Sequence, residues 1–283
     1  MLRIGFHVSI SGSVDKAVDR AVELGCNTFQ MFTSNPRAWK SKSLDEKEIK
    51  TFIQKVGNHD MNPIYGHMPY LTNLASPRDE IYCKSVNSLV SELERCQSLH
   101  IPYLVTHLGS HLGAGMHLGF ERIIRAIDQA FDETEADVTL LLENTSDSRN
   151  SMGGTFESIQ HIMRHLMYSE NTGLCLDLCH AFAAGYDLRT RDAIERTLNK
   201  LNKTIGFSRL KLVHLNDSVG DLNSHLDRHE HIGMGKIGET GFANVLRSEL
   251  RRLPMILETP KDLRRDDTEN LLKVRDLIDE NRS

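Results

Sequence analysis

The sequence predicts an α/β fold, a single (β/α)8 TIM barrel over residues 1–283 with its functional groups at one face. Eight short apolar, β-branched runs alternate with longer amphipathic stretches, the pattern of parallel strands covered by helices. The length of 283 residues suits one barrel, since barrels of this class run to about 250 residues as a single domain. No linker or low-complexity tract divides the chain. A doubly wound parallel sheet is the alternative that the same alternation allows.

The eight predicted strands are short runs rich in Val, Ile, Leu and Phe, the residues that suit a buried pleated strand. The first run follows Met1 closely, the fifth contains Leu140–Leu142, and the eighth contains Met255–Leu257. In chain order the predicted strands cover residues 3–8, 27–32, 63–67, 102–107, 138–143, 173–178, 211–215 and 255–259.

A helix is predicted after each strand, because apolar residues recur at helical spacing in the intervening segments. Leu271, Leu272 and Val274 form such a stripe in the last one. Ser76-Pro77 and Thr155 are typical of helix starts, and we expect them to begin the third and fifth helices. In chain order the predicted helices cover residues 13–24, 45–57, 78–99, 119–133, 155–167, 189–203, 240–250 and 267–280.

The composition bears on location and partners. The 34 Lys and Arg against 39 Asp and Glu give a formal charge of −5, which at first sight disfavours a nucleic-acid partner. The apolar runs are far shorter than the about 20 residues that a membrane span needs, so we expect no membrane association. Five scattered cysteines without a CxxC pair indicate reduced thiols. With no visible secretory signal, these features predict a cytoplasmic protein.

One glycine-rich segment matches a cofactor motif without its usual context. Gly233, Gly235 and Gly238 fit the GxGxxG pattern of dinucleotide-binding loops. That pattern requires a preceding buried strand, and residues 227–232 are instead mostly polar and charged. We therefore predict no nucleotide cofactor, and a loop whose glycines let the backbone approach a ligand closely.

Six consecutive predicted strands end in His, Asp or Glu. Active-site residues of such barrels come from the carboxyl ends of the strands and the loops that follow. These ends meet at one mouth, where clustered carboxylates would repel one another without a cation. The strand-end residues and the candidates in the following loops are His67, His107, Glu143, Asp177, His180, His214, Asp227, His229 and Glu258.

This donor set predicts a site for several metal ions. Imidazole and carboxylate without thiolate suit zinc, manganese or iron better than magnesium or calcium. Nine candidates exceed one four-coordinate zinc and fit two or three ions with a bridging carboxylate, an arrangement suited to phosphodiester hydrolysis. Cys175 and Cys179 flank Asp177, but we expect neither to be a ligand. His7 ends the first strand and is either a supporting residue or an ordinary one.

Longer motifs connect the sequence to a known family. They run from Gly5-Phe-His-Val-Ser to Glu258-Thr-Pro and include residues 142–145, 176–187, 214–218 and 227–238. On these motifs the sequence resembles the endonuclease IV family of apurinic/apyrimidinic endonucleases. The resemblance implies a barrel with three zinc ions, with manganese as an alternative in part of the site. The implied ligands are His67, His107 and Glu143; the bridging Glu143 with Asp177, His214 and Glu258; and His180, Asp227 and His229.

The resemblance also implies an activity. Family members cut the phosphodiester 5′ to an abasic nucleotide in duplex DNA, leaving a 3′-hydroxyl and a 5′-deoxyribose phosphate, and they clean blocked 3′ ends. Arg37 and Tyr70 match the positions that fill the gap in the base stack, and Glu143 is the implied catalytic residue. We expect a monomer. Three divalent cations would add +6 to the charge of −5, so the acidic balance describes the metal-free chain.

Differences from the family pattern fall in loops. Leu108 stands where many members have proline, and Pro36 and Met68-Pro69 lie at variable places, so they bear on loop geometry. Two other functions stay open. The first is a sugar isomerase or epimerase of the xylose-isomerase-like barrels, which the pair Asp227 and His229 disfavours. The second is a catalytically silent binder of abasic or nicked DNA, which a complete set of nine ligands disfavours.

Overall fold

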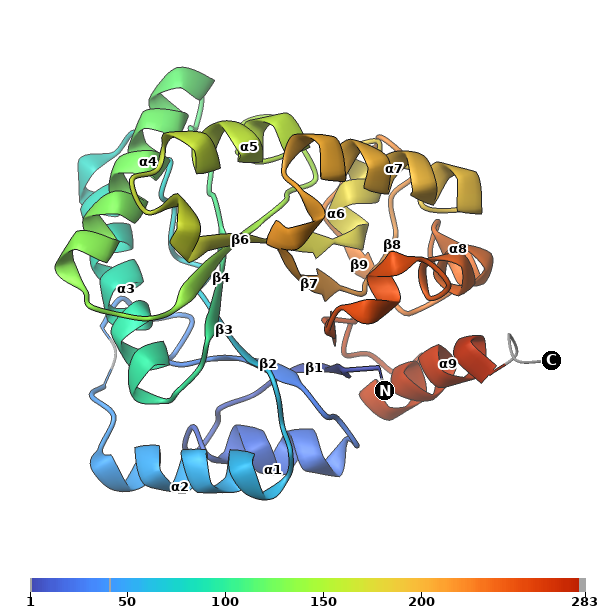
Figure 1. The fold of residues 1–283 in the computed structure, drawn as a ribbon, viewed down its shortest axis with the longest axis horizontal. Helices are drawn as coiled ribbons and strands as arrows, with labels where there is room; N and C mark the ends of the chain where they lie inside the picture. Colours follow the sequence, from blue (N-terminus) through green and yellow to red (C-terminus); the bar gives the residue numbers. More distant parts are fainter. Residues whose placement is uncertain (1, 41, 280–283) are drawn as a thin grey trace.

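A computed structural model describes residues 2–40 and 42–279 and confirms the barrel (Figure 1). Eight parallel strands close in the order β1-β2-β3-β4-β5-β6-β7-β10. Each barrel strand therefore pairs with the barrel strand that comes before it in the chain, and β10 closes the ring against β1. The strands are β1 (Ile4–Val8), β2 (Phe29–Phe32), β3 (Ile64–His67), β4 (Tyr103–His107), β5 (Thr139–Glu143), β6 (Thr172–Asp177), β7 (Leu210–His214) and β10 (Met255–Leu257).

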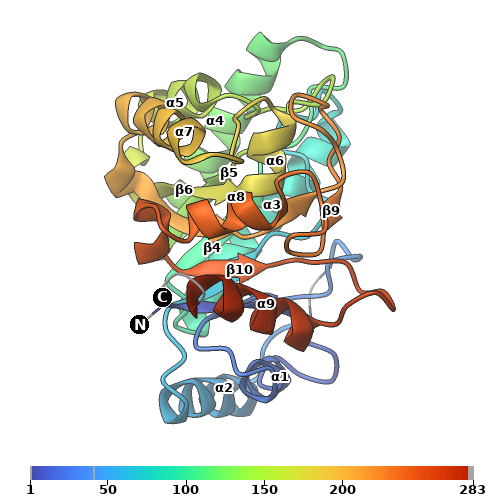
Figure 2. The ribbon, with the colours of Figure 1, turned by 90° about the vertical axis from the view of Figure 1, so that its right-hand side faces the viewer.

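Helices surround this ring on the outside, as Figures 1 and 2 show. A large apolar layer fills the space between strands and helices. None of the described helices is long and apolar enough to cross a membrane. The predicted helices correspond to α1 (Lys16–Glu23), α2 (Glu46–Asn58), α3 (Asp79–Ser98), α4 (Met116–Glu133), α5 (Phe156–His165), α7 (Arg191–Thr204), α8 (Gly238–Val245) and α9 (Asp267–Asp279), while residue 280 of the predicted last helix lies outside the described residues.

Helix starts follow local capping. The Thr155 hydroxyl accepts from the Ser158 N–H at 3.1 Å, which begins α5 as predicted. Asp45 begins α2 through a capping box with Glu48. The expectation for Ser76 is wrong, because Arg78 directly precedes α3 and the Ser76 hydroxyl contacts only the backbone of Arg78, not an N–H group inside the helix.

Two predicted elements need correction. The strand predicted over 173–178 ends at Asp177, because its carboxylate accepts from the His180 N–H at 2.7 Å and begins a short helix, α6 (Leu178–Ala183). The helix predicted over 240–250 ends at Val245. Ser248 then accepts from the Leu250 N–H and starts a 3₁₀ turn over Glu249–Arg252. A two-residue hairpin, β8 (Asp217–Ser218) with β9 (His229–Glu230), was also not predicted.

The barrel interior has its own small core of residues Tyr65, Val105, Leu141, Cys175, Leu212 and Ile256. Each lies two positions before a strand-end residue singled out in the sequence. Since side chains two apart share one face of a strand, the interior core and the candidate ligands point the same way. The interior core therefore closes the barrel below the strand-end polar side chains, which lie above it at the mouth.

Candidate metal centre

The structure brings all nine candidate ligands together at the mouth. Three groups each have ligand atoms within 4.8 Å of one another. Glu143 belongs to two of them, so the arrangement has the connectivity expected for a shared carboxylate. The groups are His67 with His107 and Glu143; Glu143 with Asp177, His214 and Glu258; and His180 with Asp227 and His229.

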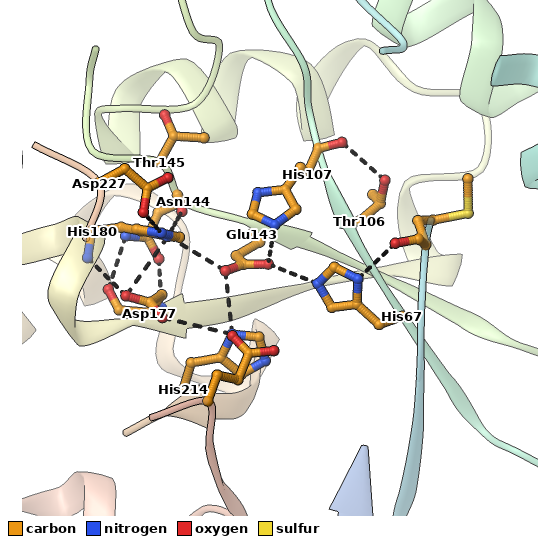
Figure 3. Close-up of polar contacts among 12 residues, drawn as sticks. His67, Thr106, His107, Glu143, Asn144, Thr145, Asp177, His180, His214 and Asp227 are labelled. Carbon is orange, nitrogen blue, oxygen red and sulfur yellow. Dashed lines mark hydrogen bonds and ion pairs between the residues drawn. The ribbon is translucent and has the colours of Figure 1, made fainter. Parts of the chain in front are cut away.

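Glu143 lies at the centre of this arrangement, between imidazoles on either side (Figure 3). Its Oε2 is 3.4 Å from His67 Nε2 and 3.6 Å from His107 Nε2. Its Oε1 is 3.2 Å from His214 Nδ1 and 3.4 Å from His180 Nδ1. Burial alone would raise the pKa of Glu143, but the charges of His107 and His214 outweigh it and hold the pKa well below its usual range. The carboxylate is therefore ionised and fixed by its neighbours.

The second group is held by two asparagines that the sequence analysis missed. Asn216 donates to Asp177 Oδ2 at 2.8 Å and accepts from the Glu258 N–H at 2.8 Å. Asn144 accepts from the Asp177 N–H at 2.8 Å. Both asparagines lie inside motifs that carry the family resemblance, so their position in those motifs was the available signal. Asn216 therefore orients the Asp177 carboxylate directly, and both asparagines fix the backbone that carries the ligands.

The third group depends on a loop that returns over the mouth. His180 Nε2 is 3.0 Å from Asp227 Oδ1. The other ring nitrogen, His180 Nδ1, lies 3.0 Å from the Asn144 carbonyl oxygen. Burial lowers the pKa of His180, but Asp177, Asp227 and Glu143 raise it further, leaving it well above its usual value. In this geometry a proton on the imidazole offsets the surrounding negative charge.

The residues present fit divalent cations on two observations. His229 Nε2 is buried and has no hydrogen-bond partner among the described residues, although it lies 3.6 Å from Asp177 Oδ2. In the described part of the chain, no Lys or Arg forms an ion pair with Glu143, Asp177 or Glu258. An unpaired imidazole nitrogen beside carboxylates that have no Lys or Arg partner is the donor set that a metal ion satisfies.

One cysteine lies close enough to the candidate ligands to be considered with them. Cys179 lies near Asp177 and His229, close enough to form a fourth potential group. Its Sγ donates to the Arg228 carbonyl at 3.5 Å, and burial raises the pKa of the thiol to about 12. The thiol is therefore protonated at neutral pH in this geometry, and the expectation that Cys179 is not a ligand stays a prediction.

A cavity of about 390 Å³ opens onto the three groups. Tyr70 lines it, is 68% exposed as a residue, and has its ring 5.0 Å, centroid to centroid, from that of Phe32. Arg37 lies elsewhere, on the exposed turn after β2, where its N–H donates to Asn35 Oδ1 at 3.0 Å. The structure thus brings Tyr70 to the mouth and leaves Arg37 outside the residues that line the cavity.

The glycine-rich loop wraps around a carboxylate of the chain itself. Asp217 Oδ2 accepts from the N–H groups of Gly233, Gly235 and Gly238, and Oδ1 accepts from Ile237. A Cβ on Gly235 would lie 2.4 Å from the Ser218 carbonyl oxygen, so the backbone does approach closely. The backbone does make a close approach at these glycines, and the group it approaches in the structure is Asp217. These N–H groups are therefore committed and unavailable to a phosphate.

Two further polar residues of the first strands reach the site. His7 Nδ1 lies 3.3 Å from Glu258 Oε1, so His7 faces the second group. Gln30 is fully buried on β2 and contacts both Glu258 and His214. The sequence analysis missed Gln30, whose only signal was one amide in an otherwise apolar strand.

Comparisons with known proteins show what the chain is similar to. Residues 18–280 match a family described as xylose isomerase-like TIM barrels. Probable endonuclease 4 of Methanoculleus marisnigri is 54% identical over 98% of this chain and 99% of its own length. The corresponding protein of Nitrosopumilus maritimus is 47% identical, with coverage of 97% and 99%.

Solved structures give the same relationship. Endonuclease IV from Thermus thermophilus superposes with a TM-score of 0.87 at 35% identity, covering 98% of this chain and 99% of the other. A D-tagatose 3-epimerase-like protein reaches a TM-score of 0.70 at 20% identity, covering 99% and 100%. The epimerase likeness is one of fold alone, whereas the sequence similarity points to the nucleases.

Proposed function

The chain belongs to the endonuclease IV family, and we propose that it hydrolyses the phosphodiester bond 5′ to abasic sites in duplex DNA. As an endonuclease IV-type nuclease it is a hydrolase. The proposed products are a 3′-hydroxyl and a 5′-deoxyribose phosphate, and the proposed second activity removes blocking groups from 3′ ends. The observation that carries the proposal is the convergence of nine His, Asp and Glu side chains in three groups beside one cavity.

Three zinc ions are the proposed cofactors, with manganese suited to part of the site. The mixture of imidazole and carboxylate donors in three of the groups supports this choice. When bound, such ions lower the pKa of a water molecule and stabilise negative charge on a phosphate. The proposed ligands are His67, His107 and Glu143; Glu143, Asp177, His214 and Glu258; and His180, Asp227 and His229.

Glu143 is the proposed catalytic residue. Its two carboxylate oxygens lie between the imidazoles of the first group and His214 of the second, so it is placed to orient an attacking water. Burial raises the pKa of both Cys175 and Cys179 to about 12, so neither supplies a thiolate nucleophile near neutral pH. We therefore propose direct hydrolysis without a covalent intermediate.

Duplex DNA is the proposed partner, bound by a monomer in the cytoplasm. An abasic nucleotide leaves the stack at low cost because it has no base to unstack. The exposed Tyr70 ring at the mouth supports a role in filling the vacated space, since a flat side chain replaces lost stacking. Arg37, on the exposed turn after β2, is proposed as its partner. Light scattering after size exclusion tests the monomer.

An incision assay tests the activity. The substrate is a labelled duplex with one tetrahydrofuran abasic analogue, which lacks the aldehyde that β-elimination requires. We expect zinc-loaded protein to cut 5′ to the analogue and leave a 3′-hydroxyl, and a chelator to abolish the cut. Failure to cut with either zinc or manganese would contradict the proposal.

A matched pair of variants tests the catalytic residue. Glu143→Gln removes a charge at the shared position and should lower kcat on the order of 10³-fold, about 4 kcal/mol. Glu121→Gln changes an exposed glutamate of α4 in the same way and should keep wild-type activity. Circular dichroism checks that both fold. Wild-type turnover by Glu143→Gln would show the assigned role to be wrong.

A further inference from the structure

We propose that Gln30 is a positioning residue that sets the tautomer of His214 and the direction of Glu258 for a metal ion. This inference rests on the proposed metal centre, and it concerns metal binding and not the DNA reaction. Gln30 lies on β2, a strand that contributes none of the nine proposed ligands. Its side chain nevertheless reaches across the barrel interior to His214 of β7 and to Glu258, which follows β10.

Every hydrogen-bonding group of the Gln30 amide is used. Nε2 lies 2.7 Å from Glu258 Oε1 and 2.9 Å from His7 Nδ1. Oε1 lies 2.9 Å from His214 Nε2. The residue has no exposed surface, and a buried amide is tolerated only when its groups are paired. The three contacts account for both N–H groups and the carbonyl oxygen.

Glu258 determines which of the two possible orientations the Gln30 side-chain amide adopts. A carboxylate only accepts hydrogen bonds, so the NH₂ group of Gln30 must face Glu258 Oε1. The carbonyl oxygen must then face His214, and His214 Nε2 must carry a proton to donate to it. The second N–H of Gln30 faces His7 Nδ1 at 2.9 Å, but that nitrogen also lies 3.3 Å from Glu258 Oε1, so His7 does not enter this assignment. One carboxylate thus determines the proton position of His214 through a single amide.

The consequence for His214 is that only Nδ1 is free to bind a cation. Nδ1 lies 3.2 Å from Glu143 Oε1 and 3.3 Å from Glu258 Oε2, the atoms of the second group. In the opposite tautomer the Nδ1–H would donate to one of these oxygens and occupy the place of a metal ion. A hydrogen bond on the far nitrogen is the general means by which proteins orient a histidine ligand.

The position demands an amide. Methionine has a similar size but neither donor nor acceptor, so it would leave His214 Nε2 and Glu258 Oε1 without their partner. Glutamate would still accept from His214 but would place a second carboxylate against Glu258. The two substitutions therefore separate the acceptor role of Gln30 from its donor role.

The first test measures zinc binding by wild type, Gln30→Met and Gln30→Glu in chelator-buffered zinc, with metal content by mass spectrometry. We expect one ion to bind about 10–100-fold more weakly in Gln30→Met, with the others unchanged. Gln129→Leu, an exposed glutamine on α4 that contacts Glu133, is the control and should bind as wild type. Unchanged affinity for every ion in Gln30→Met, or a wild type that binds no zinc, would overturn the proposal.

The second test observes the tautomer directly in the wild-type protein. Long-range ¹H–¹⁵N correlation on histidine-labelled, zinc-loaded protein should show His214 protonated at Nε2. Protonation at Nδ1 would overturn the proposal even if the variants failed to fold. Gln30→Glu should keep the wild-type tautomer, and Gln30→Met should lose it. If the zinc-binding and tautomer results are as expected but the protein does not cut abasic DNA, the proposed function is wrong and the role of Gln30 in metal binding is still supported.

Discussion

Replacing Asp217 by asparagine should loosen the loop that carries Asp227 and His229. The Asp217 carboxylate accepts from Ser218 and Ile237 at Oδ1 and from three glycine N–H groups at Oδ2. Asparagine keeps one oxygen, so its NH₂ group must face at least the two donors at Oδ1. Two buried N–H groups then lose their acceptor, at about 1–3 kcal/mol each.

An opposing term reduces this cost. Burial raises the pKa of Asp217 despite its backbone hydrogen bonds, so the ionised carboxylate carries a desolvation penalty that asparagine removes. The net loss should be about 2–4 kcal/mol. For a protein of this size that corresponds to a melting temperature lower by roughly 4–12 °C.

Calorimetry of zinc-loaded and metal-free protein measures this loss, and metal analysis reports the third group. We expect Asp217→Asn to lose zinc from His180, Asp227 and His229 while the group around Glu143 stays occupied. Asp221→Asn, an exposed aspartate of the same segment, is the matched control. Wild-type stability together with a full metal complement would refute the idea that Asp217 organises the loop.

Three other perturbations have defined outcomes. Glu92 is buried on α3 and accepts from the Thr33 and Ser34 hydroxyls at the start of the loop that carries Arg37. Glu92→Gln should therefore raise KM for abasic duplex about tenfold with kcat nearly unchanged, whereas Glu94→Gln, at an exposed position, should change neither. An equal fall in kcat would point to the metal centre instead. Burial of Asp15 opposes ionisation, but Lys55 at 2.7 Å outweighs it and lowers the Asp15 pKa, so Asp15 stabilises the fold above its ordinary pKa of 3.8 and the contribution is lost as pH falls through the lower folded pKa. The difference in urea midpoint between wild type and Asp15→Asn should therefore be present at pH 7 and close below pH about 4, and a gap that persists in acid would contradict it. Removing bound metal with a chelator should lower the melting temperature by about 10 °C, since a ligand at 1,000 times its Kd contributes about 4 kcal/mol to stability. An unchanged melting temperature after chelation would argue against a metal centre.

The strand-end residues were predictable because two regularities combine. Side chains alternate along a strand, and a closed parallel barrel brings all its carboxyl ends to one face. An apolar run that ends in a polar residue, such as Leu140-Leu-Leu-Glu143, therefore identifies both an interior strand and a side chain at the mouth. No knowledge of tertiary contacts was needed, and for the same reason the ring of eight strands followed from the sequence.

The missed features depend on contacts that local patterns do not encode. The helix α6 is short and begins at Asp177, a residue that ends a strand and begins a helix at once. The hairpin of β8 and β9 has two residues in each strand, too few for a periodic signal. The glycine loop matched a phosphate-binding pattern because it does bind an anion, but the anion is Asp217, whose place in the chain carried no sign of that pairing.

Gln30 illustrates why local patterns could not identify an orienting residue. Six strands place an apolar or aromatic residue two positions before a proposed ligand, and this repetition made the ligands visible. Gln30 is a single polar residue in an otherwise apolar strand, and its partners His214 and Glu258 lie 184 and 228 residues away in the sequence. Closure of the barrel alone brings them together. If the amide itself is what matters, apolar exchanges in the barrel interior such as Val105→Ile should leave zinc affinity unchanged, while Gln30→Met should weaken it. Equal effects of the two substitutions would mean that packing, and not the amide, sets the geometry of the site.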